Sequence, residues 1–175
     1  MPTVCIIDID TTLANNDHRA LALKRDLQGK VTQESWDAFL QADLMLLDKP
    51  QEHAKSVVDY MRSHGYMIVF LTGRNEKHLG VTQAWLRTHM GRTDDEILLM
   101  RSAEYSGQPA SVFKEEKFLQ FIQEHNLQDA SFLFFEDDKH VLAMWRKYGL
   151  VFQCPEAWQW LNPEIPEAEE LAWSR

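Results

Sequence analysis

The sequence contains few cysteines, which restricts the chemistry and the compartment that we expect. The two cysteines, Cys5 and Cys154, stand in separate apolar stretches and lack metal-ligand spacing. Disulfides are rare in the cytosol, and zinc sites need clustered ligands. We therefore expect two buried free thiols.

Long apolar runs and targeting signals are also missing. No stretch reaches the roughly 20 apolar residues that a membrane-spanning helix needs. The start of the chain, Met1 to Asp10, has no basic segment and carries two aspartates, which is unlike a signal peptide. We therefore expect a cytoplasmic protein that does not act on membranes.

The chain has no excess of positive charge, since its formal net charge is -9. This charge opposes non-specific attraction to a nucleic-acid backbone. It does not exclude the binding of a nucleic-acid strand end by a few well-placed cationic side chains. We find no Gly-x-x-x-x-Gly-Lys-[Ser/Thr] element, so we expect no kinase half within these residues. Repeats and low-complexity tracts are absent too.

Apolar runs alternate with segments of helical character along the chain. The runs are typical of strands buried on both faces, and they are Thr3–Ile9, Tyr66–Leu71, Glu96–Met100, Ser131–Phe135 and Leu150–Cys154. The predicted helices are Gln51–His64, Lys77–Met90, Ser111–His125 and Lys139–Tyr148, and we expect Gly65, Gly91 and Gly149 to end three of them. The alternation predicts an α/β fold, a doubly wound, Rossmann-like parallel sheet whose ligand site lies at the carboxyl ends of the strands.

We interpret residues 1–175 as a single domain in which residues 14–50 form a small helical cap insertion. This excursion follows the first strand, and helix-start residues within it are Thr32 and Ser35. The acidic tail carries Trp158, Trp160 and Trp173. We expect these tryptophans to cover the core rather than to form a partner surface, because large aromatic side chains gain most from burial.

A pair of aspartates, Asp8 and Asp10, follows the first predicted strand. Two residues apart, their carboxylates would share one face if the strand continued straight. Two neighbouring negative charges need a cation, and Mg²⁺ suits oxygen ligands. One carboxylate is then able to attack phosphorus, while the other moves protons. Exposed strand-end carboxylates without a role are the competing interpretation.

Three further elements stand at strand ends or helix starts. Thr72 and Gly73 follow an apolar strand, where a hydroxyl and a backbone amide are able to hold phosphate oxygens; a simple turn is the alternative. Lys114 lies near the start of a predicted helix, where a lysine is usually solvated. Glu136 and Asp137 end another apolar strand, and acids there also serve as helix N-caps.

The order of these elements resembles the four motifs of the haloacid dehalogenase-like phosphatase superfamily, over roughly Thr3 to Cys154. The resemblance implies that Asp8 is the nucleophile and Asp10 the general acid and base. It also implies that Thr72 binds the transferring phosphoryl group and that Lys114 neutralises charge on Asp8 and the phosphate.

The same resemblance implies a Mg²⁺ site. Asp8, the carbonyl of Asp10, Glu136 and Asp137 would hold the ion. Glu136 stands where aspartate is more usual, so either Glu136 or Asp137 is the direct ligand. Thr11 replaces the glycine that is common at its position.

The chain is also similar to the phosphatase domain of bacteriophage polynucleotide kinase. Asn16 to Arg19, Thr72 to Arg74, and Arg101 ahead of the segment Val112 to Glu116 carry this likeness. It implies a substrate that is a nucleic-acid or nucleotide 3′-phosphate held by Arg19, Gly73, Arg74 and Arg101. The alternatives are a phosphatase for a small metabolite or free nucleotide, and a non-catalytic binding module on the same fold.

Overall fold

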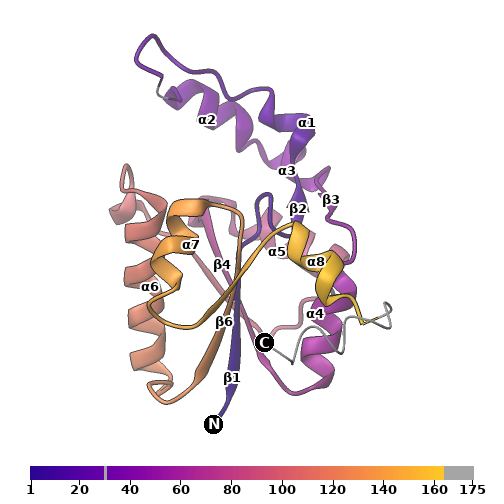
Figure 1. The fold of residues 1–175 in the computed structure, drawn as a ribbon. Coiled ribbons are helices and arrows are strands. Elements are labelled where there is room, and N and C mark those ends of the chain that lie inside the picture. Colours follow the sequence, from indigo (N-terminus) through magenta and orange to yellow (C-terminus); the bar gives the residue numbers. More distant parts are fainter. Residues whose placement is uncertain (30, 164–175) are drawn as a thin grey trace.

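A computed structural model describes residues 1–29 and 31–163. Its centre is a five-stranded parallel sheet with the order β5-β4-β1-β6-β7 (Figure 1). The strands are β1 (Thr3–Ile7), β4 (Met67–Asn75), β5 (Ile97–Arg101), β6 (Ser131–Glu136) and β7 (Leu150–Gln153). Every predicted strand is present, and the doubly wound α/β fold is confirmed.

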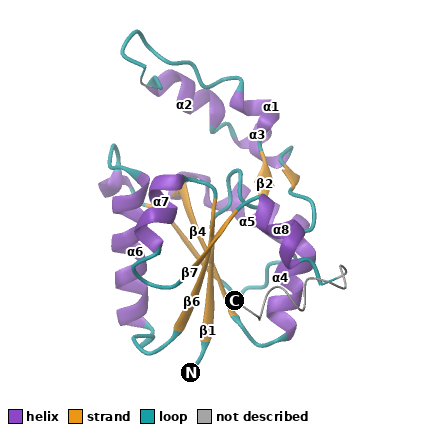
Figure 2. Ribbon diagram, in the orientation of Figure 1, coloured by secondary structure: helices purple, strands orange, loops and turns teal. Residues whose placement is uncertain are grey.

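Helices cover both faces of this sheet (Figure 2). They are α4 (Ala54–Ser63), α5 (Leu79–Met90), α6 (Ala110–Glu124), α7 (Lys139–Trp145) and α8 (Glu156–Leu161). Alternate residues of β1 serve opposite faces: Cys5 and Ile7 pack with α4, α5 and α8, whereas Val4 and Ile6 pack with α6 and α7. Both cysteines are free and buried, as expected.

Two strand ends differ from the prediction, and both differences lie beside the carboxyl edge of the sheet. β1 ends at Ile7 rather than Ile9. β4 continues beyond its predicted end at Leu71, through Thr72-Gly73-Arg74, for which a simple turn was the alternative interpretation, and reaches Asn75. Its register with β5 shifts between Leu71 and Asn75, so an irregularity replaces the turn. Such bulges redirect side chains next to binding sites.

A helical insertion rises above the carboxyl edge of the sheet (Figure 1). Its base is a short antiparallel pair, β2 (Ala14–Asn15) with β3 (Lys49–Pro50). Between them lie α1 (Asp17–Ala20), α2 (Gln33–Phe39) and α3 (Ala42–Leu46). Thr32 is the N-cap of α2 and accepts from the amide of Ser35, so of the two helix-start residues it is Thr32 that begins the helix. The predicted helical cap is therefore present, while the single-domain boundary of 1–175 stays a prediction.

The glycines after the core helices do not all act in the same way. Gly65 and Gly91 have positive φ values, 74° and 64°, which glycine adopts without strain. Gly149 was expected to do the same, and this was wrong. A Cβ on Gly149 would lie 2.2 Å from the carbonyl oxygen of Phe132. Close approach of two backbone segments, rather than helix capping, therefore requires glycine at this position.

The tail tryptophans have different fates. Trp158 is fully buried and stacks on Phe135 with ring centroids 5.0 Å apart, so it covers the core as predicted. Trp160 is 66% exposed, so for this residue the prediction was wrong. The helix α8 has only about one and a half turns, and only one of its faces packs toward the sheet. Trp173 lies outside the described residues. Within these residues no helix is long and apolar enough to cross a membrane.

Replacing Gly149 by alanine should destabilise the fold, because the new methyl group would overlap the carbonyl of Phe132. Overpacking of this kind costs about 1–3 kcal/mol. Gly80 of α5 is a matched control, since a Cβ there meets nothing within 4 Å. Gly80→Ala should raise the free energy of unfolding by about 0.5–1 kcal/mol. Denaturant unfolding of both variants measures the difference, and a Gly149→Ala protein as stable as the wild type would contradict the close approach.

Candidate active site

The carboxyl ends of three neighbouring strands, β1, β4 and β6, carry the predicted site residues. Asp8 follows β1 and donates its backbone amide to the carbonyl of Phe135 on β6, at 3.0 Å. Glu136 is the last residue of β6, and Thr72 lies within β4. Strand order alone thus brings together groups that are 64 residues or more apart in the sequence.

Lys114 lies between two of the acids. Its Nζ is 2.8 Å from Oδ1 of Asp8 and 2.6 Å from Oε2 of Glu136. All three side chains are at most 7% exposed. The solvated lysine that we considered as an alternative is therefore excluded, because the ammonium has exchanged water for two buried carboxylates.

Asp8, Glu136 and Asp137 form an acidic cluster, with ligand oxygens within 4.8 Å of one another. Burial raises the pKa of Asp8 to about 7, although Lys114 opposes the shift. Burial and the charge of Asp8 likewise raise the pKa of Asp137 to about 6. The pKa of Lys114 lies above its usual value, since the two carboxylates outweigh the cost of burial. A set of oxygen donors that retains excess negative charge fits a hard divalent cation.

The two oxygens of Glu136 already have partners. Oε2 accepts from Lys114, and Oε1 accepts from the amide of Asp138 at 3.4 Å. Asp137 is only half-buried, and its Oδ1 accepts from the hydroxyl of Thr12 at 3.3 Å. Asp138 is the N-cap of α7 and accepts from the amides of His140 and Val141. The N-cap of α7, which was the alternative role for these acids, is therefore Asp138. Glu136 and Asp137 do not cap the helix and are available to contact a cation.

Asp10, like Asp8, lies beyond the end of β1, so the straight strand on which the shared face depended is not formed here, and the shared face stays a prediction. The carboxylate of Asp10 turns toward two arginines. Arg74 donates from Nε to Oδ2 and from Nη2 to Oδ1, each at 2.8 Å, and Nη2 of Arg19 also contacts Oδ1. Burial alone raises the pKa of Asp10, but the guanidinium groups outweigh this and hold it well below its usual range.

Arg19 and Arg74 are each 1% exposed, so neither is a solvated surface residue. Both also bind Asp48, whose side chain is fully buried. Within the described residues Nη1 of Arg74 is buried without a hydrogen-bond partner. The Asp48 carboxylate was missed from the sequence, because a lone acid ahead of Lys49-Pro50 matches no motif.

Thr72, Gly73 and Arg101 line the β4 side of the site. Thr72 is fully buried, and its hydroxyl accepts from the amide of Arg74 at 3.2 Å. A Cβ on Gly73 would lie 4.0 Å from Nη2 of Arg101. Nη1 of Arg101 donates to the carbonyls of Tyr105 and Gln108, at 3.2 and 2.8 Å. Nη2 of Arg101 therefore lies near Gly73, while Nη1 of the same guanidinium group holds the loop before α6.

The loop after Asp10 is held by residues from distant elements. Thr11 has a φ of 68°, a left-handed conformation that explains the glycine preference at this position and that strains a β-branched residue. Asn16, which is part of the sequence likeness but has no predicted role, donates to Oδ1 of Asp10 at 3.3 Å. Trp158 of α8 donates from Nε1 to the carbonyl of Thr12 at 2.7 Å.

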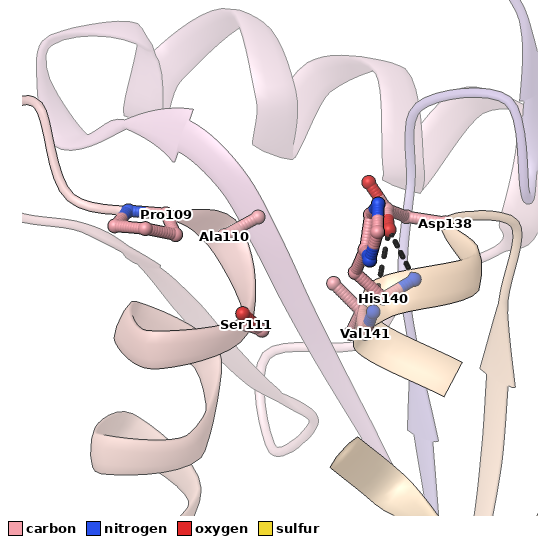
Figure 3. Close-up of a pocket in the computed structure, with 6 residues that line it drawn as sticks. All are labelled: Pro109, Ala110, Ser111, Asp138, His140 and Val141. Atoms are coloured by element: carbon pink, nitrogen blue, oxygen red, sulfur yellow. Dashed lines mark hydrogen bonds between the residues drawn. The ribbon is translucent and has the colours of Figure 1, made fainter. Parts of the chain in front are cut away.

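A cavity of about 390 Å³ opens between the beginnings of α6 and α7 (Figure 3). None of the predicted site residues lines it, but Asp138 directly follows Asp137 in the chain. Its lining residues are Pro109, Ala110, Ser111, Asp138, His140 and Val141.

Solved structures share this fold. A chain of the Pnkp1/Rnl/Hen1 complex superposes with a TM-score of 0.62 at 23% identity, covering 87% of this chain and 45% of that one. CbbY from Rhodobacter sphaeroides, in complex with phosphate, has a TM-score of 0.56 at 14% identity, over 87% of each chain. A phospho-aspartyl intermediate analogue of phosphoserine phosphatase has a TM-score of 0.52 at 14% identity, over 87% and 86%. The chain thus spans less than half of the Pnkp1 complex chain.

No curated protein matches the sequence. Residues 2–157, however, match the model of the family described as the polynucleotide kinase PNKP phosphatase domain. This match covers most of the chain, from the start of β1 into α8. The chain therefore belongs to the polynucleotide kinase PNKP phosphatase domain family, and it is a phosphatase, a hydrolase of phosphoric monoesters, on the haloacid dehalogenase-like fold.

Proposed function

We propose that the protein is a Mg²⁺-dependent phosphomonoesterase that uses Asp8 as its nucleophile and removes 3′-phosphates from nucleic-acid ends or nucleotides. The observation that carries the proposal is the buried contact of Asp8 with Lys114 beside Glu136 and Asp137. The ammonium group of Lys114 neutralises charge on one oxygen of Asp8, and a phosphate bound beside Asp8 would contact the same ammonium group. This arrangement suits in-line attack on phosphorus.

The charges of the site support a divalent cation. Among the residues that the structure describes, Lys114 is the one cation paired with this cluster of three acids, Asp8, Glu136 and Asp137. When all three are ionised, the cluster keeps two uncompensated negative charges, which would repel a phosphate dianion. Asp8, Asp137 and the carbonyl of Asp10 are the groups that would hold Mg²⁺, while Glu136 holds Lys114. A bound Mg²⁺ would neutralise charge on the phosphoryl oxygens.

Two in-line steps follow from the positions of the side chains. Asp10 first takes up a proton from solvent. Asp8 then attacks phosphorus, and an aspartyl-phosphate forms as the leaving oxygen takes this proton from Asp10. Asp10 then takes a proton from water, which attacks the aspartyl-phosphate and releases phosphate. Thr72 and Lys114 bind the transferring oxygens. Because two guanidinium groups hold Asp10, its first proton transfer requires the incoming phosphate to draw guanidinium donors toward itself, and Arg74 has a spare one in Nη1.

The nucleic-acid substrate is supported by family membership and by the cations near the site. The similar Pnkp1 chain belongs to an RNA repair complex, and residues 2–157 match a polynucleotide kinase phosphatase family. Arg101 reaches the Gly73 side of the site, and Arg19 and Arg74 lie beside Asp10. A small phosphorylated metabolite or free nucleotide is the alternative substrate, which the net charge of -9 favours.

Asp8→Asn should abolish turnover while the fold survives, because the amide keeps the shape and the contact with Lys114 but does not attack phosphorus. We expect kcat to fall by about 10⁴-fold or more on any phosphomonoester. Asp59→Asn is the matched control, since this exposed carboxylate pairs with Lys55 and Arg62 on α4. Steady-state rates measure the loss of turnover, and melting curves show whether the fold survives. Near-native turnover by Asp8→Asn would contradict the assignment of Asp8 as the nucleophile.

Magnesium should stabilise the protein more strongly as the pH rises from about 6 to about 8, because Mg²⁺ binds ionised carboxylates. The pKa values of Asp8 and Asp137 are raised to about 7 and about 6. Without metal, the folded state binds more protons than the unfolded chain. The contribution of Asp8 and Asp137 to the free energy of unfolding is therefore fully present below about pH 4 and is lost as the pH rises past about 7.

Melting curves with Mg²⁺ and with a chelator, at several pH values, measure this effect without relying on turnover. Asp137→Asn should reduce the increase in melting temperature, whereas Asp59→Asn should leave it unchanged. A melting temperature at pH 8 that is the same with Mg²⁺ and with chelator would contradict the metal site.

Reversing the charge of Arg101 should harm hydrolysis of a 3′-phosphorylated oligonucleotide far more than hydrolysis of a small aryl phosphate. Arg101→Glu removes a cation from the rim, and we expect kcat/KM on the oligonucleotide to fall about ten-fold further. Arg101 also braces the loop before α6, so Arg101→Lys, which keeps the charge, should restore much of the selectivity.

Arg87→Glu is the control for the change in overall charge. Arg87 lies in the last turn of α5, pairs with Asp94 and is half-exposed. This end of α5 lies at the opposite edge of the sheet from the site. Salt should weaken the wild-type oligonucleotide reaction only mildly, because few contacts release few counterions. Equal losses on both substrates in Arg101→Glu would favour the metabolite alternative.

A further inference from the structure

We propose that Asp48 is a positioning residue of the phosphatase site, which holds Asp10 in place through Arg19 and Arg74. The inference rests on the proposed function, in which Asp10 moves protons at the leaving oxygen. Asp48 has no motif of its own and touches neither the acidic cluster nor Lys114 in any contact that the structure shows.

The contacts of Asp48 fix both guanidinium groups. Arg19 binds it with two donors, Nε to Oδ1 at 2.7 Å and Nη2 to Oδ2 at 2.7 Å. Arg74 donates from Nη2 to Oδ2 at 2.9 Å. Such paired contacts set the plane of a guanidinium as well as its position. The same Nη2 atoms of Arg19 and Arg74 also reach Oδ1 of Asp10.

Exposure separates the roles of the two aspartates. The side chain of Asp48 is fully buried, whereas that of Asp10 is 23% exposed. A substrate entering from solvent is therefore able to reach Asp10 and its arginine contacts, while Asp48 stays behind the arginines. Asp48 is the partner that the guanidinium groups keep when they share their donors between Asp10 and a phosphate.

The surroundings of Asp48 are rigid. Its backbone carbonyl accepts from Nε1 of Trp85 on α5 at 2.7 Å, and its amide donates to the carbonyl of Met45 at 3.3 Å. Arg19 is held further by the carbonyl of Phe39 at 3.0 Å, and its guanidinium lies 4.0 Å from the Phe39 ring centroid. The end of the insertion and the α5 helix thereby determine where Asp10 points.

Removing the charge of Asp48 should disturb Asp10 in a defined way. Two arginines would then share one carboxylate, the partly exposed Asp10, instead of two. Both guanidinium groups would be attracted to Asp10, and no carboxylate at position 48 would fix the orientation of their planes. The expected result is an Asp10 that is held off the leaving oxygen, rather than a general loss of the site.

Asp48→Asn tests this, because it keeps the shape and one acceptor oxygen. The measured quantity is kcat/KM on a nucleoside 3′-phosphate and on p-nitrophenyl phosphate, which covers steps up to departure of the leaving group. A sugar oxygen needs a proton to leave, but nitrophenolate does not. We expect the loss on the 3′-phosphate to exceed the loss on the aryl ester by about ten-fold or more.

Two reference variants make the result specific. Glu96→Gln removes a carboxylate from another largely buried arginine pair, with Arg62 at 2.6 Å, and should lower both rates equally and only slightly. Asp10→Asn should show the same leaving-group contrast as Asp48→Asn, but larger. If Asp10→Asn shows the contrast and Asp48→Asn loses both activities equally, the positioning role is overturned while the proposed function stands. If Asp48→Asn does not fold, Asp48→Glu replaces it with the same expectation, since the longer side chain shifts the paired contacts.

Solvent exchange of the arginine Nε protons, followed by NMR, tests the positioning without catalysis. In the wild type the Nε protons of Arg19 and Arg62 should both exchange slowly, because both donate to carboxylates. Asp48→Asn should accelerate exchange at Arg19 by about ten-fold or more and leave Arg62 unchanged, and Glu96→Gln should do the reverse. Should Asp10→Asn show no leaving-group contrast, the proposed role of Asp10 fails, and this measurement alone decides the positioning: unchanged exchange at Arg19 in Asp48→Asn overturns it.

Discussion

The buried ammonium of Lys114 is the contact on which the site depends, since it lies between Asp8 and Glu136 at the edge where three strands end. Parallel strands necessarily bring their carboxyl ends to one edge, and here β1 and β6 bring acids there together. Without a cation these carboxylates would repel each other or take up protons. Lys114 offsets part of this charge, and the negative charge that remains on the cluster fits the divalent cation of the proposed function.

A second set of charges lies beside the first and is balanced within itself. Asp10 and Asp48 face Arg19 and Arg74. Such buried networks contribute little net stability, and their use lies in fixing geometry. Because Arg19 and Asp48 come from the two sides of the helical insertion, the insertion contributes to this charged network as well as covering the sheet. The two carboxylates and the two guanidinium groups balance each other in charge, so no buried charge in this network is left without a partner.

Much of the site was predictable because its residues stand at recognisable places in the chain. Asp8, Thr72, Lys114, Glu136 and Asp137 follow apolar runs or begin helices, and the sheet brings them together as expected. Asp48 and the carbonyl of Thr12 were not predictable. Their importance comes from contacts with Arg19 and Trp158, across 29 and 146 residues, and no local pattern marks a residue whose partners lie so far away.

The sequence by itself determined the doubly wound sheet, the edge that carries the site and the residues of the acidic cluster. Apolar runs and strand-end polar groups encode these features locally. Only the tertiary structure decided that the carboxylate of Asp10 meets two arginines, that Gly149 serves a close approach rather than a helix end, and that Arg19 and Arg74 are buried. Each of these depends on which side chains meet across elements, and in a charged interior the partner, rather than the residue type, sets burial, orientation and pKa.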